Sequence, residues 1–172
     1  KRDIPLEVTA LRSSNSPLPE DVASLVHRQI QNFLQEDFDL AFITNPTLLH
    51  AITLGQLRGR VETFFIEKPI FDHASYDLDV LGLHETQKAY VAAPMRWCGV
   101  YAALKKRLAG LPVYSVRALC SSYLPEWRPN ADYRTVYSAH ANMGGGVALD
   151  LIHEWDYLTD LFGFPADTAL LR

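Results

Sequence analysis

Short apolar runs alternate with longer amphipathic stretches from residue 6 to about residue 108. The pattern predicts strands at Leu6–Leu11, Leu40–Thr44, Thr63–Ile66 and Ala89–Ala93. It predicts helices at Glu20–Glu36, Pro46–Leu57, about Ala74–His84 and Val100–Leu108. Strands that are apolar along their whole length and alternate with helices are typical of a parallel sheet covered on both faces. We therefore predict a doubly wound α/β layer for this part of the chain.

Beyond Gly110 the pattern changes. Val113–Cys120 mixes apolar and polar residues, which is typical of an antiparallel strand with one polar face. A long loop, Ser121–Met143, comes next, and the apolar periodicity after it predicts one helix over Val147–Phe162. The change predicts a domain boundary near Gly110, with one domain over residues 1–110 and the beginning of a second over residues 111–172.

The composition excludes several classes of function. The 172 residues carry a net charge of −4, and the longest basic run is Lys105–Arg107, so nucleic-acid binding has no electrostatic support. No apolar run is long enough to cross a bilayer, which argues against a membrane partner. Cys98 and Cys120 lack the spacing of metal ligands. We therefore predict no metal site, and two reduced, partly buried thiols in a cytoplasmic protein.

The strand predicted at Thr63–Ile66 runs into Glu67-Lys68-Pro69. In an open α/β sheet, ligands lie at the carboxyl ends of the strands, where this lysine falls. A lysine at that edge can exchange a proton with a substrate hydroxyl. The alternative is a solvated lysine in a turn at the end of a strand.

Three glycines, Gly144 to Gly146, open the helix predicted at Val147–Phe162. Helical spacing places Asp150 and His153 on one face of that helix, apart from its apolar stripe. Glycine lets the backbone approach a ligand closely, so this face is a candidate wall of a polar cleft. The spacing fits a helix face turned to water equally well, and both interpretations stay open.

Arg12 and Ser13 follow the first predicted strand. In dinucleotide-binding folds, an arginine after the second strand accommodates the 2′-phosphate of NADP, whereas an acid there binds the ribose of NAD. If Leu6–Leu11 is that strand, Arg12 and Ser13 favour NADP over NAD; a solvated arginine in a loop is the alternative. His50, four residues after Pro46, either faces the cofactor cleft or lies on a helix surface.

The loop over Ser121–Met143 is rich in aromatic and charged side chains. Aromatic platforms flanked by hydrogen-bonding groups suit polyhydroxylated ligands. The candidates for binding a sugar-like substrate are Tyr123, Trp127, Tyr133 and Arg134. The loop could instead be an ordered structural loop packed by its own aromatic rings.

Three stretches carry a resemblance to a known family: Ala41–His50, Glu67–Pro69 and Gly144–His153. In this order and at these separations they resemble the glucose–fructose oxidoreductase/inositol dehydrogenase family (the Gfo/Idh/MocA group). The stretch Ser122–Arg134 further resembles a branch of that family often associated with bacterial surface-sugar biosynthesis. The similarity runs through essentially the whole chain.

The resemblance implies a partial Rossmann dinucleotide-binding domain over residues 1–110. Over residues 111–172 it implies the start of a substrate and oligomerisation domain with an open mixed sheet. The implied activity is hydride transfer between a nicotinamide cofactor, NADP with NAD as an option, and a hydroxyl or carbonyl carbon of a sugar or sugar derivative. A homo-oligomer is also implied.

The resemblance implies a role for each residue that matches the family's motifs. It makes Lys68, Asp150 and His153 catalytic. The residues that match the cofactor side are Thr44, Asn45, Pro46, His50, Glu67 and Lys68, with Arg96 at the end of a strand. Arg12 and Ser13 complete the predicted cofactor site.

The sequence departs from the family in two respects. Asp150 and His153 are three residues apart, whereas the family more commonly spaces them by four, and this rotates the imidazole. No Gly-x-Gly-x-x-Gly turn occurs in this sequence, although the family places one on a first strand and helix ahead of Leu6. We therefore expect the middle of such an enzyme. The second hypothesis is a non-catalytic fragment or interaction module derived from one.

Overall fold

The computed structural model describes residues 4–14, 16–32, 36–76 and 86–169. The chain falls into two compact units, Lys1–Asp37 and Phe38–Arg172. The first unit holds a small strand–helix–strand motif, and the second holds a larger sheet and the other described helices. The boundary predicted near Gly110 falls inside the second unit, and it stays a prediction.

The first unit contains β1 (Thr9–Leu11), α1 (Glu20–Ala23) and β2 (Arg28–Ile30). The two strands are parallel neighbours, with Ala10 opposite Gln29. The strand predicted over the first apolar run is thus confirmed in its second half.

The helix predicted at Glu20–Glu36 is wrong beyond Ala23, because a strand follows within the predicted range. The His27 and Arg28 N–H groups both donate to the Val8 carbonyl oxygen, at 2.9 and 3.2 Å, and this leads the chain into pairing with β1. A partner strand elsewhere in the sequence therefore outweighs the local helical periodicity. Residues 33–35 of the predicted helix lie outside the described part of the chain.

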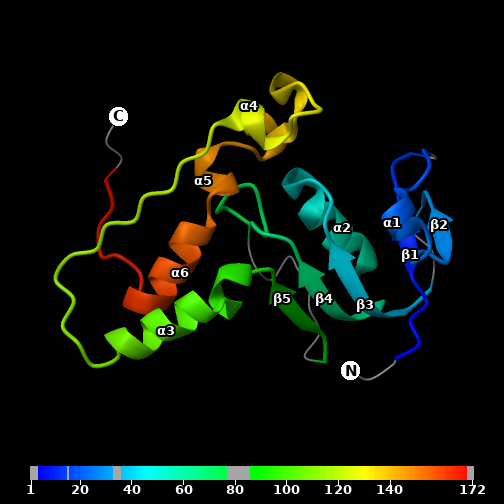
Figure 1. Cartoon of the computed structure of the whole chain (residues 1–172). Helices are drawn as coiled ribbons and strands as arrows, with labels where there is room; N and C mark the ends of the chain where they lie inside the picture. Colours follow the sequence, from blue (N-terminus) through cyan, green and yellow to red (C-terminus); the bar gives the residue numbers. More distant parts are fainter. Residues whose placement is uncertain (1–3, 15, 33–35, 77–85, 170–172) are drawn as a thin grey trace. The chain divides into compact units, whose positions relative to one another are not determined.

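The second unit is built on β3 (Phe38–Ile43), β4 (Val61–Ile66) and β5 (Lys88–Val91). These strands form one parallel sheet in the order β3-β4-β5 (Figure 1). The three strands predicted here are confirmed, with ends that differ by at most two residues. A mixed α/β class with small all-parallel sheets is therefore confirmed for the described residues.

The helix predicted at Pro46–Leu57 is confirmed as a 3₁₀ turn, η1 (Thr47–Leu49), that continues into α2 (His50–Leu57). Pro46 stands just before η1, at its N-cap position. The apolar core is formed by one face of the sheet together with α2. Its buried side chains include Ile43, Leu54, Leu57, Phe64 and Ile66.

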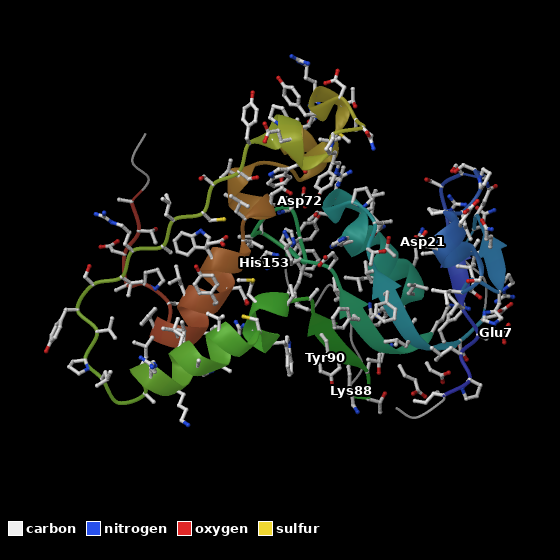
Figure 2. The ribbon with its side chains drawn as sticks, viewed as in Figure 1. Glu7, Asp21, Asp72, Lys88, Tyr90 and His153 are labelled. Atoms are coloured by element: carbon white, nitrogen blue, oxygen red, sulfur yellow. The ribbon has the colours of Figure 1, made fainter. Side chains whose placement is uncertain are left out.

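On the opposite face, the side chains toward the carboxyl ends of the strands are exposed, although the strand pattern predicted cover on both faces. Phe42, Phe65 and Tyr90 are register partners across the three strands and lie on this face. Phe42 is 64% exposed, and its ring contacts that of Phe65 at a centroid distance of 5.6 Å. Lys88 and Tyr90 are the residues of β5 on the same side (Figure 2). The described helices thus cover one face and leave these rings open to solvent.

After the sheet, η3 (Pro94–Trp97) leads into α3 (Gly99–Leu108), which confirms the predicted helix. The strand predicted at Val113–Cys120 is wrong, because this stretch is irregular and exposed, with Tyr114 at 93% exposure (Figure 1). No described strand pairs with it. Alternating side chains do not make a strand when the main chain lacks a neighbour to receive its hydrogen bonds.

The long loop contains short helices instead of being wholly irregular. They are α4 (Leu124–Trp127), η4 (Tyr133–Thr135), η5 (Tyr137–Ala139) and η6 (Ala141–Met143). The helix predicted after it breaks into α5 (Val147–Asp150) and α6 (His153–Phe162). The helix predicted at about Ala74–His84 lies mostly outside the described residues. None of the described helices is long and apolar enough to cross a membrane.

Candidate functional site

Lys68 stands at the carboxyl end of β4, the middle strand of the three-stranded sheet. The sheet continues one residue past the strand, because the Glu67 N–H donates to the Ile43 carbonyl oxygen at 2.8 Å. The Glu67 carboxylate accepts from the Lys68 N–H at 2.8 Å, and the Lys68–Pro69 peptide is cis. The main chain of Lys68 is thus fixed by the sheet.

The Lys68 side chain connects the two sequence motifs. Its Nζ donates to the main-chain carbonyl oxygen of Asp150 at 2.6 Å. In a continuous α-helix that carbonyl would accept from the Glu154 N–H, which here donates to Leu151 at 3.5 Å. The lysine therefore replaces the helical donor at the carboxyl end of α5. Insertion of a side chain into the hydrogen-bond ladder is a known cause of helix breaks.

Asp150 and His153 consequently belong to two helices, and the prediction that they share one helix face is wrong. Asp150 is the last residue of α5, and His153, which Figure 2 labels, is the first of α6. Both residues are half-buried. Their relative orientation depends on the break at Leu151 and Ile152. Asp150 and His153 thus flank the two-residue break, next to the carbonyl oxygen that Lys68 binds.

The glycine turn before α5 packs against protein main chain, not against open space. A Cβ on Gly145 would lie 2.1 Å from the Tyr137 carbonyl oxygen, so only glycine fits there. Gly144 has a φ of +78°, and a Cβ on it would lie 3.2 Å from the Cβ of Thr47. These glycines were predicted to let the main chain approach a ligand. At Gly145 the close approach is to η5 of the same chain. This contact fixes where α5 begins.

Asp72 packs beside the glycine turn, although no sequence motif singled it out. A Cβ on Gly144 would lie 3.3 Å from the Asp72 Cβ, so the carboxylate side chain lies against the glycine turn. The side chain is only 17% exposed, and its Oδ1 is buried without a hydrogen-bond donor among the described residues. An acid directly after the apolar pair Ile70-Phe71 was the available signal.

His50 is a core residue with both ring nitrogens engaged. It is 1% exposed, with Nδ1 3.0 Å from the Ile70 carbonyl oxygen and Nε2 2.9 Å from that of Asn45. The ring thereby ties the turn after β3 to the segment after Lys68. Its predicted contact with a cofactor stays a prediction, and such a contact through a ring nitrogen would break one of these bonds.

Arg96 lies against α6, where its guanidinium is held by two carboxylates. It donates from Nε and Nη2 to the Asp156 carboxylate, at 2.9 and 2.7 Å, and from Nη1 to Asp160 at 2.9 Å. A further Nη2 bond reaches the Asp156 carbonyl oxygen at 3.2 Å. Hydrogen bonding to Asp156 raises the pKa of Arg96. These four bonds give the arginine a structural role, and its cofactor role stays a prediction.

Asp160 also binds α3. Lys105 Nζ donates to its Oδ2 at 2.7 Å, and the Tyr101 hydroxyl donates to the same oxygen. These two hydrogen bonds, from Lys105 first and Tyr101 second, lower the pKa of Asp160. Burial is the main cause that raises the pKa of Tyr101. The cluster thus joins α3, α6 and Arg96; we call it the Arg96 clamp.

The remaining predicted cofactor residues of the second unit follow β3. Thr44 and Pro46 are exposed at its carboxyl end. Asn45 is half-buried and donates from Nδ2 to the Thr53 hydroxyl at 2.8 Å, while its Oδ1 has no donor among the described residues. These residues and Lys68 lie at the carboxyl ends of adjacent parallel strands.

In the first unit, Arg12 stands at the carboxyl end of β1 among hydroxyl groups. Its Nη2 donates to the Ser16 hydroxyl at 3.2 Å and its Nη1 to Gln29 Oε1 at 3.0 Å. The Ser14 and Ser16 hydroxyls are 2.8 Å apart, and Ser13 is exposed. A guanidinium with neighbouring hydroxyls is a suitable donor set for a phosphate.

Three of the four predicted substrate residues contact their own loop. Tyr123 is exposed, and the Trp127 indole N–H donates to the Ser122 hydroxyl. The Arg134 guanidinium lies 4.5 Å from the Tyr133 ring centroid. These contacts match the alternative of a loop packed by its own aromatic rings, while substrate binding stays a prediction.

Among the described residues, no group of three or more His, Cys, Asp or Glu side chains could hold a metal ion. Both cysteines are free thiols, and Cys120 is exposed where partial burial was predicted. Its hydrogen bond with Glu154 raises the pKa of the Cys120 thiol. No protein-family model, curated protein or solved structure matches the chain.

Proposed function

We propose that the chain carries the catalytic lysine of an NAD(P)-dependent oxidoreductase that acts on a sugar or sugar derivative. The observation that carries this proposal is the 2.6 Å bond from Lys68 Nζ to the Asp150 carbonyl oxygen. It joins two of the three stretches on which the family resemblance rests, through residues 82 positions apart in sequence. It also holds a primary amine at the carboxyl end of a parallel strand, where ligands of open α/β sheets lie.

The strand topology supports a Rossmann-type layer. In the doubly wound strand order 3-2-1-4-5-6, strands 3-2 form one run and strands 4-5-6 form another. The parallel pair β2-β1 and the parallel trio β3-β4-β5 match these runs in chain order. No described strand corresponds to strand 1, which carries the glycine-rich turn in that fold.

In the oxidative direction, the substrate loses a proton from its hydroxyl and a hydride from the same carbon. Lys68 Nζ, as a free amine, accepts the proton while one of its N–H groups stays on the Asp150 carbonyl. The carbon–oxygen bond becomes a carbonyl as the hydride leaves. His153 passes the proton onward, and the Asp150 carboxylate orients the pair. In the reductive direction each proton moves the opposite way.

Each unit, taken by itself, holds residues that this proposal assigns to the cofactor. In the first unit, Arg12 and the serine hydroxyls beside it suit the 2′-phosphate of NADP. In the second unit, Thr44 and Pro46 are exposed at the end of β3 and match the cofactor side of the family. When bound, NADP supplies the hydride acceptor or donor.

A titration with NADPH and then NADH, followed by nicotinamide fluorescence, tests the proposal. We expect micromolar binding with NADPH preferred. An Arg12→Gln variant should lose the preference for NADPH while its affinity for NADH stays unchanged. Absence of binding to either cofactor contradicts catalysis by this chain.

The second hypothesis, a non-catalytic interaction module, is favoured by one observation: the exposed rings of Phe42, Phe65 and Tyr90. Light scattering tests this second hypothesis. A defined dimer that a Phe42→Lys variant converts to a monomer supports a docking surface on this face. Heterogeneous aggregation supports an incomplete fold.

A further inference from the structure

The glycine turn before α5 packs against main chain so closely that it leaves no room for a side chain. A Cβ on Gly145 would lie 2.1 Å from the Tyr137 carbonyl oxygen and 2.8 Å from the Ser138 Cα, whereas Cβ atoms in proteins essentially never approach other atoms within 3.0 Å. Both contacts are main-chain atoms, which cannot rotate aside as the end of a side chain can. Any side chain at position 145 must therefore move the turn away from η5.

Two main-chain hydrogen bonds hold the turn where it packs. The Gly145 N–H donates to the His140 carbonyl oxygen at 3.1 Å. The Gly146 N–H donates to the Ser138 carbonyl oxygen, also at 3.1 Å. A displacement of the turn by about 1 Å would take both bonds beyond hydrogen-bond distance. The position of the turn thus depends on the missing side chain of Gly145.

α5 connects the turn to Lys68. It is a single turn of helix, in which the Asp150 N–H donates to the Gly146 carbonyl oxygen at 2.9 Å. At the end of this helix, the Asp150 carbonyl oxygen accepts from Lys68 Nζ at 2.6 Å. Because so short a hydrogen-bonded segment moves as one body, a displacement of Gly146 also displaces the oxygen that Lys68 binds.

The main chain of Lys68 cannot follow such a displacement. Its N–H donates to the Glu67 carboxylate at 2.8 Å, and the Glu67 N–H donates to the Ile43 carbonyl oxygen of β3 at 2.8 Å. The sheet therefore holds one end of the lysine, and the carbonyl oxygen of α5 holds the other. A lysine side chain has many rotamers, so it regains conformational freedom when its amine loses that partner.

We infer that Gly145 is a positioning residue for Lys68. Its lack of a side chain lets the turn pack on η5, and this packing brings the Asp150 carbonyl oxygen to the lysine Nζ. The inference rests on the proposed function, because it concerns the placement of the amine that exchanges the substrate proton. A side chain at position 145 should therefore slow the chemical step and leave cofactor binding in place.

Gly145→Ala tests the inference through the reactivity of the lysine. Acetic anhydride modifies free amines, and peptide mass spectrometry after treatment of the full chain gives the rate at Lys68. We expect Lys68 to react about fivefold faster in Gly145→Ala than in the wild type, the factor that loss of one hydrogen bond gives. Lys105, which binds Asp160 of α6, should react at an unchanged rate, whereas a general loss of structure would accelerate both lysines.

Turnover is measured on the same samples, as reduction of NADP with D-glucose as the probe substrate. We expect kcat to fall about 10²-fold in Gly145→Ala, since displacement of a catalytic group by about 1 Å has an effect of that size. The NADPH affinity, measured by fluorescence, should stay unchanged. The expected acetylation rates without NADPH binding by the wild type support the placement of Lys68 by Gly145 and contradict the proposed function.

Gly99→Ala is the matched control, because a Cβ there meets no atom within 4 Å, and it should leave the rate at Lys68 unchanged. Where Gly145→Ala fails to fold, Gly144→Ala moves the turn by a smaller amount, since its closest contact is 3.2 Å. It should still raise the rate at Lys68. An unchanged rate at Lys68 in a folded variant, or an equal rise at Lys105, overturns the inference.

Discussion

Two cations contact the C-terminal helices of this protein, and they do so in different ways. Lys68 gives one hydrogen bond to a main-chain carbonyl of α5. Arg96 gives four hydrogen bonds to Asp156 and Asp160 of α6. An ammonium carries three N–H donors and a guanidinium five. The arginine is therefore nearly saturated by protein partners, whereas the lysine uses one donor on the described residues and has further donors for a ligand.

This difference separates a structural cation from a candidate catalytic one. Both residues follow a strand of the same parallel sheet, and the family resemblance gives both a site role. Only the hydrogen-bond partners distinguish them, because carboxylates neutralise a cation and a single carbonyl oxygen does not. We therefore expect substitutions of Lys68 to affect chemistry and substitutions of Arg96 to affect stability.

The largest effect is expected from Lys68→Met. Loss of a positioned acid–base group lowers rates by about 10²–10⁴-fold. Reduction of NADP by neutral sugars, followed by nicotinamide absorbance, measures this rate, and NADPH binding should remain measurable. Lys88→Met, an exposed lysine on β5, is the control and should keep full turnover. Turnover retained in Lys68→Met would remove the lysine from the mechanism.

A smaller effect, on stability, is expected from Arg96→Ala. The variant leaves Asp156 without its main partner and removes one of three partners of Asp160, which should lower the free energy of unfolding by roughly 1–3 kcal/mol after allowance for partial solvent exposure. Urea unfolding measures the change. Arg107→Ala, an exposed arginine on α3, should leave the midpoint unchanged. Equal midpoints for both variants would show that the Arg96 clamp contributes nothing.

The smallest effect is expected on the urea midpoint at acidic pH. Hydrogen bonds from Lys105 and Tyr101 lower the pKa of Asp160 below its ordinary value. A lowered carboxyl pKa stabilises the fold above the unfolded-state pKa, and this stabilisation is lost as the pH falls through the folded-state pKa. The urea midpoints of the wild type and Asp160→Asn should therefore differ at neutral pH and converge below about pH 4.

Measurements of stability at alkaline pH test the same cluster through Tyr101. Burial, followed by the bond to Asp160, raises the pKa of Tyr101. A raised pKa stabilises the fold below the unfolded-state value, and this contribution is lost as the pH rises through the folded-state value. The wild type should thus keep the contribution of Tyr101 up to about pH 10 and lose it above. A contribution of this cluster to the urea midpoint that changes between about pH 5 and pH 9 would contradict the raised pKa of Tyr101 and the lowered pKa of Asp160.

The sequence by itself determined the elements that depend on neighbouring residues. Wholly apolar runs gave β3, β4 and β5, and the amphipathic stretch before Gly110 gave α3. The strand-end position of Lys68 followed from the same local pattern. Side-chain periodicity and breakers such as Pro46 act over a few residues, and they can be read without knowing the fold.

The tertiary structure decided which partners those elements have. Arg28–Ile30 became a strand because β1 offered a neighbour, and Val113–Cys120 did not because no described strand pairs with it. The break between Asp150 and His153 depends on a lysine 82 residues earlier. Arg96 became structural through carboxylates at least 60 residues away. Hydrogen bonds over such separations leave no periodic trace in sequence, because they are selected by the packed fold and not by the local chain.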